Sequence, residues 1–176
     1  KMWYAIEPSY MEKEDIKDYI NLADESYAEN GGVVQPYGEN PLKEELLAEN
    51  VYLNMAKNAK KYLYIMTPYL LIDDATNDEL VLAAKRGVDV RIITPGIPDK
   101  KLIYKMTRSY YNALARGGVK IYEYTPGFMH AKQYVCDDSV AVVGTINMDY
   151  RSLYLHFENG VLMYNMGEIF KIKEDF

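Results

Sequence analysis

Five polar residues in the last third of the chain are of types that can handle a phosphoryl group. His130 and Lys132 are two residues apart, as are Thr145 and Asn147, and Glu158 follows them. In extended backbone, side chains two residues apart share a face, so each pair converges on one spot. Lysine, asparagine and threonine donate hydrogen bonds suited to a phosphoryl oxygen, while histidine serves as a nucleophile or an acid. The spacing therefore predicts a site that stabilises charge on a phosphoryl group.

Two carboxylates accompany the donors. Glu158 enters a predicted strand and is placed to accept a hydrogen bond from one imidazole nitrogen of His130, which leaves the other nitrogen free to attack. Asp137 faces opposite to Lys132 if the strand alternates strictly, so geometry alone gives it a supporting role in fixing a turn. Each residue taken singly has an ordinary explanation, because a lone histidine is more often a surface or core residue than a catalyst. Only the common spacing indicates a site.

The elements that must position these residues follow an α/β pattern. Strand-like and helical segments alternate in the order βαβαβ over residues 62–66, 77–86, 88–93, 98–116 and 119–124. This order is typical of a parallel sheet with crossover helices. Strand-like runs separated by short turns follow at 132–136, 140–144 and 157–164, and a last helix is expected over 166–176. We expect an α/β fold with a mixed, largely parallel sheet flanked by helices on both faces.

The beginning of the chain is expected to stand apart from this fold. Apolar spacing predicts a helix over 12–27, and the Pro- and Gly-containing segment that follows is expected to be irregular up to Asn40. Asn40 as N-cap and Pro41 at the first helical position predict a helix to about residue 60, with Leu42 on its buried stripe. The predicted division is an N-terminal helix and linker over 1–37 and one domain over 38–176.

Composition limits the partners. The net charge of −6 and the pI of about 5.0 suit long stretches of phosphate backbone poorly, so no nucleic acid partner is expected. One candidate basic face is formed by Lys100, Lys101, Lys105 and Arg108. Cys136 is the single cysteine, so no intrachain disulfide is possible. No run of 18 apolar residues occurs, and we expect this chain itself to be soluble and not to span a bilayer.

The spacing of the polar residues resembles the HKD motif of the phospholipase D superfamily, His-x-Lys-x4-Asp-x6-Gly-(Ser/Thr)-x-Asn. His130-Ala131-Lys132, Asp137 and Gly144-Thr145-Ile146-Asn147 fill every defining position. Glu158 stands where many members carry a glutamate that supports the histidine. The resemblance implies a phospholipase D-like fold and a catalytic set made of His130, Lys132, Asp137, Thr145, Asn147 and Glu158.

A wider resemblance covers residues 38–164 and points to the C-terminal catalytic half of bacterial cardiolipin synthases. It rests on segments such as Ile65-Met66-Thr67-Pro68-Tyr69, residues 86–93, residues 118–124 and Asn147-Met148-Asp149-Tyr150-Arg151-Ser152-Leu153. Those enzymes carry two motifs in one polypeptide, preceded by membrane-spanning helices. Since this chain contains one motif and no span, we expect it to be part of a longer protein.

The resemblance implies a reaction as well. Two phosphatidylglycerol molecules would give cardiolipin and glycerol through a phosphohistidine, one histidine attacking phosphorus and the other protonating the leaving alcohol. The implied partners are phosphatidylglycerol, the other HKD half and the membrane surface, and the parent enzyme would lie at the bacterial cell membrane with its catalytic domain facing the cytoplasm. No cofactor and no metal is expected. Besides His130 the chain has only His156, which we expect to be peripheral.

Two other functions stay open. A nuclease or phosphodiesterase of the same superfamily with a single motif would complete its site by forming a homodimer. A non-catalytic half-domain would serve assembly or membrane docking, although packing alone would not require His130, Lys132 and Asn147 together.

Overall fold

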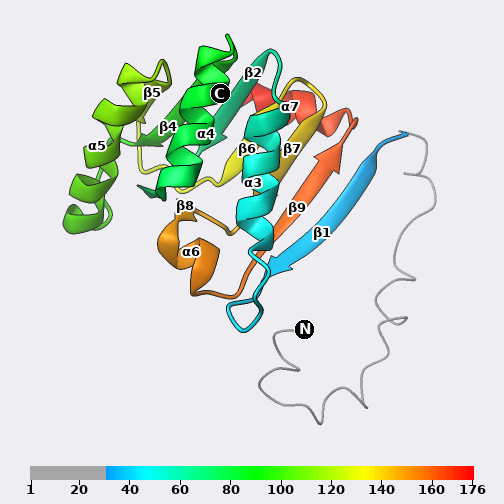
Figure 1. Cartoon of the computed structure of the whole chain (residues 1–176), viewed down its shortest axis with the longest axis horizontal. Helices are drawn as coiled ribbons and strands as arrows, with labels where there is room; N and C mark the ends of the chain where they lie inside the picture. Colours follow the sequence, from blue (N-terminus) through cyan, green and yellow to red (C-terminus); the bar gives the residue numbers. More distant parts are fainter. Residues whose placement is uncertain (1–30) are drawn as a thin grey trace. The chain divides into compact units, whose positions relative to one another are not determined.

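The computed structural model describes residues 31–176, so the helix expected over 12–27 lies outside the described part (Figure 1). The chain divides into two units, Lys1–Gly31 and Gly32–Phe176. The second unit begins with strand β1 (Val33–Glu39). This strand occupies a segment expected to be irregular and runs across the expected domain boundary between residues 37 and 38.

A seven-stranded mixed sheet forms the centre of the second unit, in the order β1-β9-β7-β6-β2-β4-β5 (Figure 1). As the βαβαβ pattern predicts, neighbouring strands are parallel in β2 (Tyr62–Met66), β4 (Asp89–Pro95) and β5 (Lys120–Tyr124). All other pairs in this sheet are antiparallel, and they involve β1, β6 (Gln133–Cys136), β7 (Val140–Gly144) and β9 (Glu158–Tyr164). The α/β class is confirmed. The expectation of a largely parallel sheet is wrong, because strands joined by a short turn, such as β6 and β7, cannot be parallel.

Helices cover both faces of the sheet, as expected (Figure 1). One face carries α3 (Leu47–Asn58), α4 (Asp74–Lys85) and α5 (Lys101–Arg116), and the other carries α7 (Glu168–Glu174). Side chains of β2 alternate between two cores: Leu63 and Ile65 join the large core with the helices of the first face, while Tyr62 packs with Ile169 of α7. Burial of apolar surface on both faces holds the sheet in place.

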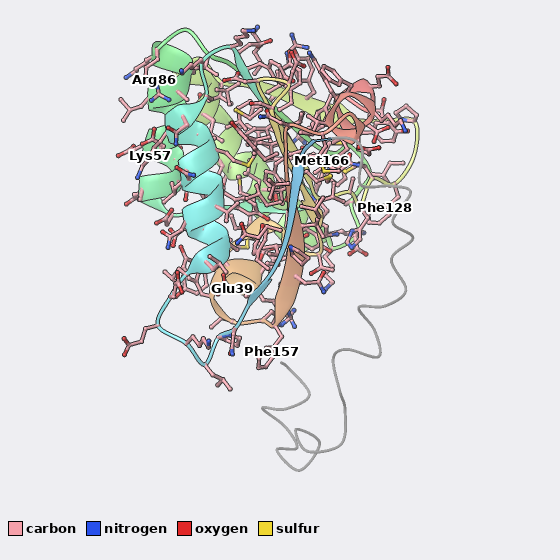
Figure 2. The ribbon with its side chains drawn as sticks, turned by 90° about the vertical axis from the view of Figure 1, so that its right-hand side faces the viewer. Glu39, Lys57, Arg86, Phe128, Phe157 and Met166 are labelled. Carbon is pink, nitrogen blue, oxygen red and sulfur yellow. The ribbon has the colours of Figure 1, made fainter. Side chains whose placement is uncertain are left out.

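Helix α3 begins at Leu47 and not directly after Asn40. Leu42, expected on the buried stripe, is exposed, and the Asn40 side chain closes a turn by accepting a hydrogen bond from Leu42 N at 2.9 Å. The helix takes its cap from the end of β1, where the buried Glu39 carboxylate accepts a hydrogen bond from Ala48 N at 2.7 Å (Figure 2). An acceptor on a neighbouring strand thus replaces the local N-cap.

A second sheet, separate from the large one, has two strands that were not predicted. Strand β3 (Leu70–Leu71) pairs in parallel with β8 (Met148–Asp149), and the short helix α6 (Tyr150–Tyr154) follows. The buried Thr67 hydroxyl ties the two segments, because it donates to Tyr69 O at 2.8 Å and accepts from Met148 N at 3.0 Å. The loop after β2 is therefore anchored to the segment that follows β7.

Gly144, the last residue of β7, permits a close approach to β9. A Cβ at this position would lie 2.4 Å from Asn159 O and 2.7 Å from Gly160 Cα, both of them backbone atoms. We expect Gly144→Ala to lower the free energy of unfolding by about 1–3 kcal/mol, the usual cost of overpacking. Denaturant unfolding followed by circular dichroism measures the change.

Gly127→Ala is the matched control, since nothing lies within 4 Å of a Cβ at that position. An equal loss of stability in both variants would contradict the steric explanation.

Candidate active site

Three strands of the large sheet bring the predicted residues to one edge. β6 begins just after Lys132, β7 ends just before Thr145, and β9 begins at Glu158. Because β7 is antiparallel to both neighbours, its end lies beside their beginnings, with Gly144 opposite Gly160. Segments that are distant in the sequence therefore meet at a single place.

A cavity of about 850 Å³ opens at this edge. Every predicted site residue except Asp137 lines it: His130, Lys132, Thr145, Asn147 and Glu158. The loop between β5 and β6 supplies the first two, and the connection between β7 and β8 supplies the next two. The volume lies within the usual range of small-molecule sites.

The imidazole of His130 lies between aromatic rings. The ring of Phe128 stacks on it with centroids 5.6 Å apart, and Tyr69 meets it edge-on at 6.2 Å. Partial desolvation and the positive charge of Lys132 lower the pKa of His130, while Asp99 acts in the opposite direction. The first two effects favour the uncharged imidazole, which carries a lone pair on one nitrogen.

Lys132 is half-buried, and its ammonium donates a hydrogen bond to His130 O at 2.7 Å. Desolvation lowers the pKa of Lys132, and the charges of Glu158 and Asp149 oppose this effect. An ammonium has three donors, so two remain for an oxygen in the cavity. Residues 130–132 precede β6 rather than belong to it, yet both side chains line the cavity as the spacing predicted.

A chain of hydrogen bonds runs along the opposite wall. The Thr145 hydroxyl donates to Glu158 Oε2 and accepts from Asn159 N at 3.0 Å. Ser152 Oγ donates to Glu158 Oε1 at 3.4 Å and accepts from Asn147 Nδ2 at 2.9 Å. Asn147 and Thr145 are thus held in place through one carboxylate, and Thr145 directs its proton at Glu158 rather than into the cavity.

His156 lines the same cavity, so the expectation that it is peripheral is wrong. Its Nδ1 lies 3.6 Å from Glu158 Oε1, and its Nε2 accepts a hydrogen bond from Arg151 Nε at 2.7 Å. Within the described residues Glu158 contacts this histidine and makes no hydrogen bond to His130. His156 and Glu158 are two residues apart, as His130 and Lys132 are, so the same spacing could have predicted that His156 belongs to the site.

Asp137 lies at the far end of β6, away from the cavity. Its carboxylate accepts hydrogen bonds from the amides of Lys60, Lys61 and Tyr62 at 2.7, 2.8 and 2.9 Å. Desolvation opposes its ionisation, but these three amides prevail and lower the pKa of Asp137. The structure thus places it where the alternation argument does, at a turn, and separates it from the other motif residues.

The mouth of the cavity includes residues that the sequence did not single out for chemistry. Tyr69, after β2, donates its phenolic proton to Asp99 Oδ2, in the loop after β4, at 2.6 Å. Desolvation and the neighbouring Asp99 raise the pKa of Tyr69 to about 12. The two loops are therefore joined at the rim, where Lys100 and Ile103 also line the cavity.

Comparisons with known proteins give both sequence relatives and structural neighbours. A profile of the family described as "Cardiolipin synthase, PLD-like domain" matches residues 52–176. An uncharacterized protein of Streptococcus mutans is 47% identical over the whole chain, which corresponds to 37% of that protein's length. A cardiolipin synthase of Alkalihalophilus pseudofirmus is 37% identical over 86% of the chain and 30% of its own length. The chain thus spans about a third of these relatives.

Solved structures show the same fold. Nuc from Salmonella typhimurium, a phospholipase D family member, superposes with a TM-score of 0.68 at 23% identity, covering 82% of this chain and 91% of Nuc. Phosphatidylserine synthase from Haemophilus influenzae superposes with a TM-score of 0.62 at 20% identity, covering 83% of this chain and 38% of its own.

Residues 31–176 contain neither a membrane-spanning helix nor a cluster of metal ligands. No helix there is both long and apolar enough to cross a bilayer. In the same part of the chain, no three acidic, histidine or cysteine side chains gather in a way that would hold a metal ion.

Asp137→Ala removes the acceptor for three amides at the start of β2. We expect the free energy of unfolding to fall by about 1–3 kcal/mol at pH 7, because three amides, one of them partly buried, lose hydrogen bonds to a charged acceptor. Because the folded pKa is lowered, the stabilisation is present above the unfolded value of about 3.9 and is lost as the pH falls through the folded pKa. The difference from wild type, measured by denaturant unfolding, should shrink below about pH 4. A difference that is unchanged at low pH would refute the role of the charge.

Lys132→Met tests the electrostatics of His130. Loss of the ammonium should raise the pKa of His130, which in wild type lies below the usual 6.5 or so. NMR titration of the two histidine rings measures both values directly in this chain. Lys85→Met, a change at an exposed lysine of α4, is the control and should leave the pKa unchanged. A pKa that moves equally in both variants would sink this account.

Proposed function

The chain belongs to the family of cardiolipin synthase PLD-like domains, and we propose that it supplies one half of a two-motif site that transfers a phosphatidyl group. The observation that carries the proposal is the cavity, which brings His130, Lys132 and Asn147 together and leaves the His130 ring without a hydrogen bond to the described residues. The share of the relatives that the chain spans, 37% and 30%, leaves room in such proteins for a second half.

The proposed reaction has two displacements. A ring nitrogen of His130, or of its counterpart in the other half, attacks the phosphorus of phosphatidylglycerol and forms a P–N bond. The P–O bond to glycerol breaks, and the second histidine gives its proton to the leaving oxygen. The hydroxyl of another phosphatidylglycerol then attacks phosphorus and forms a new P–O bond, the P–N bond breaks, and the hydroxyl proton returns to the second histidine as cardiolipin is released. Both displacements use the same pocket, and the balance is two phosphatidylglycerol molecules for one cardiolipin and one glycerol.

The polar side chains of the cavity divide the remaining work. Lys132 has donors left for the non-bridging phosphoryl oxygens, whose charge grows in each transition state. Asn147 has a cavity position fixed by Ser152. Both are assigned as phosphoryl ligands, and Thr145 is assigned a supporting role because its hydroxyl donates to Glu158.

Glu158 is assigned to orient a histidine, and its contacts suggest which one. In this chain it reaches Thr145, Ser152 and His156, and no hydrogen bond joins it to His130. We therefore assign it to the imidazole that the other half contributes, which must enter this same cavity to complete the site. A carboxylate there would hold the tautomer and stabilise the imidazolium that forms.

His130→Ala in the full-length, two-motif parent tests the proposal. We expect cardiolipin formation from labelled phosphatidylglycerol to fall by about 10³-fold or more, because the variant lacks one of the two histidines. Thermal unfolding of the variant should match wild type, since the ring is exposed.

Substantial residual cardiolipin formation would overturn the assignment of His130. Phosphodiester cleavage by the isolated chain, with a dimeric mass in light scattering, would instead support the single-motif homodimer.

A further inference from the structure

Helix α5 turns apolar side chains to solvent beside the cavity. Leu102 is 70% exposed and Met106 is 42% exposed, and they lie one helical turn apart. The inner face of the helix holds Thr107 and Leu114, which are buried. Large apolar side chains exposed together on one surface indicate a site of interaction rather than a core.

The helix and the loop before it are also basic. Residues 97–116 contain five lysines and arginines and one acidic residue, a net charge of +4 within a chain of −6. Lys101 and Lys105 flank the two apolar side chains, and Lys100 adjoins them. None of these three lysines takes part in an ion pair among residues 31–176, whereas Arg108 pairs with Glu123 at 3.1 Å. We call Lys101, Leu102, Lys105 and Met106 the α5 patch.

The α5 patch is continuous with the mouth of the cavity. Lys100 and Ile103, its neighbours in the first turn, line the cavity together with His130. On another part of the cavity lining, Tyr150 of the short helix α6 is 60% exposed, and Leu155, just after this helix, is 59% exposed. Apolar and basic side chains therefore stand beside the opening through which a substrate must pass.

We infer that the α5 patch docks this chain onto an anionic phospholipid surface, with the cavity mouth at the level of the headgroups. Apolar side chains enter the boundary of the acyl chains, and lysines beside them pair with anionic headgroups. The positive charge of the α5 patch favours an anionic bilayer as its partner, although the chain as a whole is acidic. The inference deepens the proposed function, which takes an anionic lipid as substrate.

Vesicle binding by the purified 176-residue chain tests the inference. Vesicles of phosphatidylcholine alone are compared with vesicles of equal parts phosphatidylcholine and phosphatidylglycerol, and the bound fraction is measured by sedimentation. We expect binding to the anionic vesicles only, and weakening as salt is added. Lys101→Ala with Lys105→Ala should weaken binding about 30-fold, since each lysine near an anionic surface strengthens binding about fivefold. Leu102→Ser with Met106→Ser should also weaken it.

Lys57→Ala with Lys85→Ala is the matched control. It removes the same charge from the last turns of α3 and α4, whereas the α5 patch lies in the first two turns of its helix. This control should bind like wild type. Vesicle binding is measured without turnover, so a failure of the proposed chemistry leaves the docking result interpretable.

Three outcomes would overturn the inference. Equal binding to both kinds of vesicle would remove the role of anionic lipid, and equal weakening in the control would reduce the effect to net charge. The third outcome is that the patch substitutions leave vesicle binding unchanged, while the chain has a dimeric mass in light scattering that is lost in Leu102→Ser with Met106→Ser. That result would assign the patch to contact with a second copy of the chain.

Discussion

The close backbone contact between β7 and β9 at Gly144 and Gly160 is the constraint on which the site depends. It places the end of one strand directly beside the start of the other, and β6 on the far side of β7 brings its own start to the same edge. Catalytic side chains on three separate segments then need no long excursions to meet. A side chain at residue 144 would push β9 away and move Glu158 relative to Thr145. Gly144 therefore sets the distance between Thr145 and Glu158.

Electrostatics within the cavity follow from the same placement. Lys132 and His130 come from one short loop, so the ammonium is always near the imidazole and disfavours its protonation. The acidic groups lie on the segments after β7 and β4. The cavity therefore holds charges of both signs, with Glu158 and Asp149 acting on Lys132 and Asp99 acting on His130.

The sequence predicted the parallel half of the sheet well because strong periodicity and glycine punctuation mark its elements. It missed β1, where Pro36 and Gly38 suggested a loop; an edge strand tolerates proline, since only one side is paired. The start of α3 was misplaced because its cap comes from Glu39, on another element. Two-residue strands such as β3 leave no pattern to detect. At the site, spacing predicted which residues gather, but not that Glu158 would meet His156 in place of His130, since that depends on the path of α6.

The turn after β6 has a consequence for how the HKD signature is understood. Asp137 adopts a φ of 54°, in the left-handed region, while its carboxylate accepts from three amides. Aspartate and asparagine tolerate that backbone conformation, but only a carboxylate offers full charge to the amides; glutamate has the charge without the same backbone tolerance. The positive φ and the need for a charged acceptor together favour aspartate at this position. In this chain the aspartate of the signature lies at a turn and binds three amides at the start of β2, away from the cavity that the other residues of the signature line.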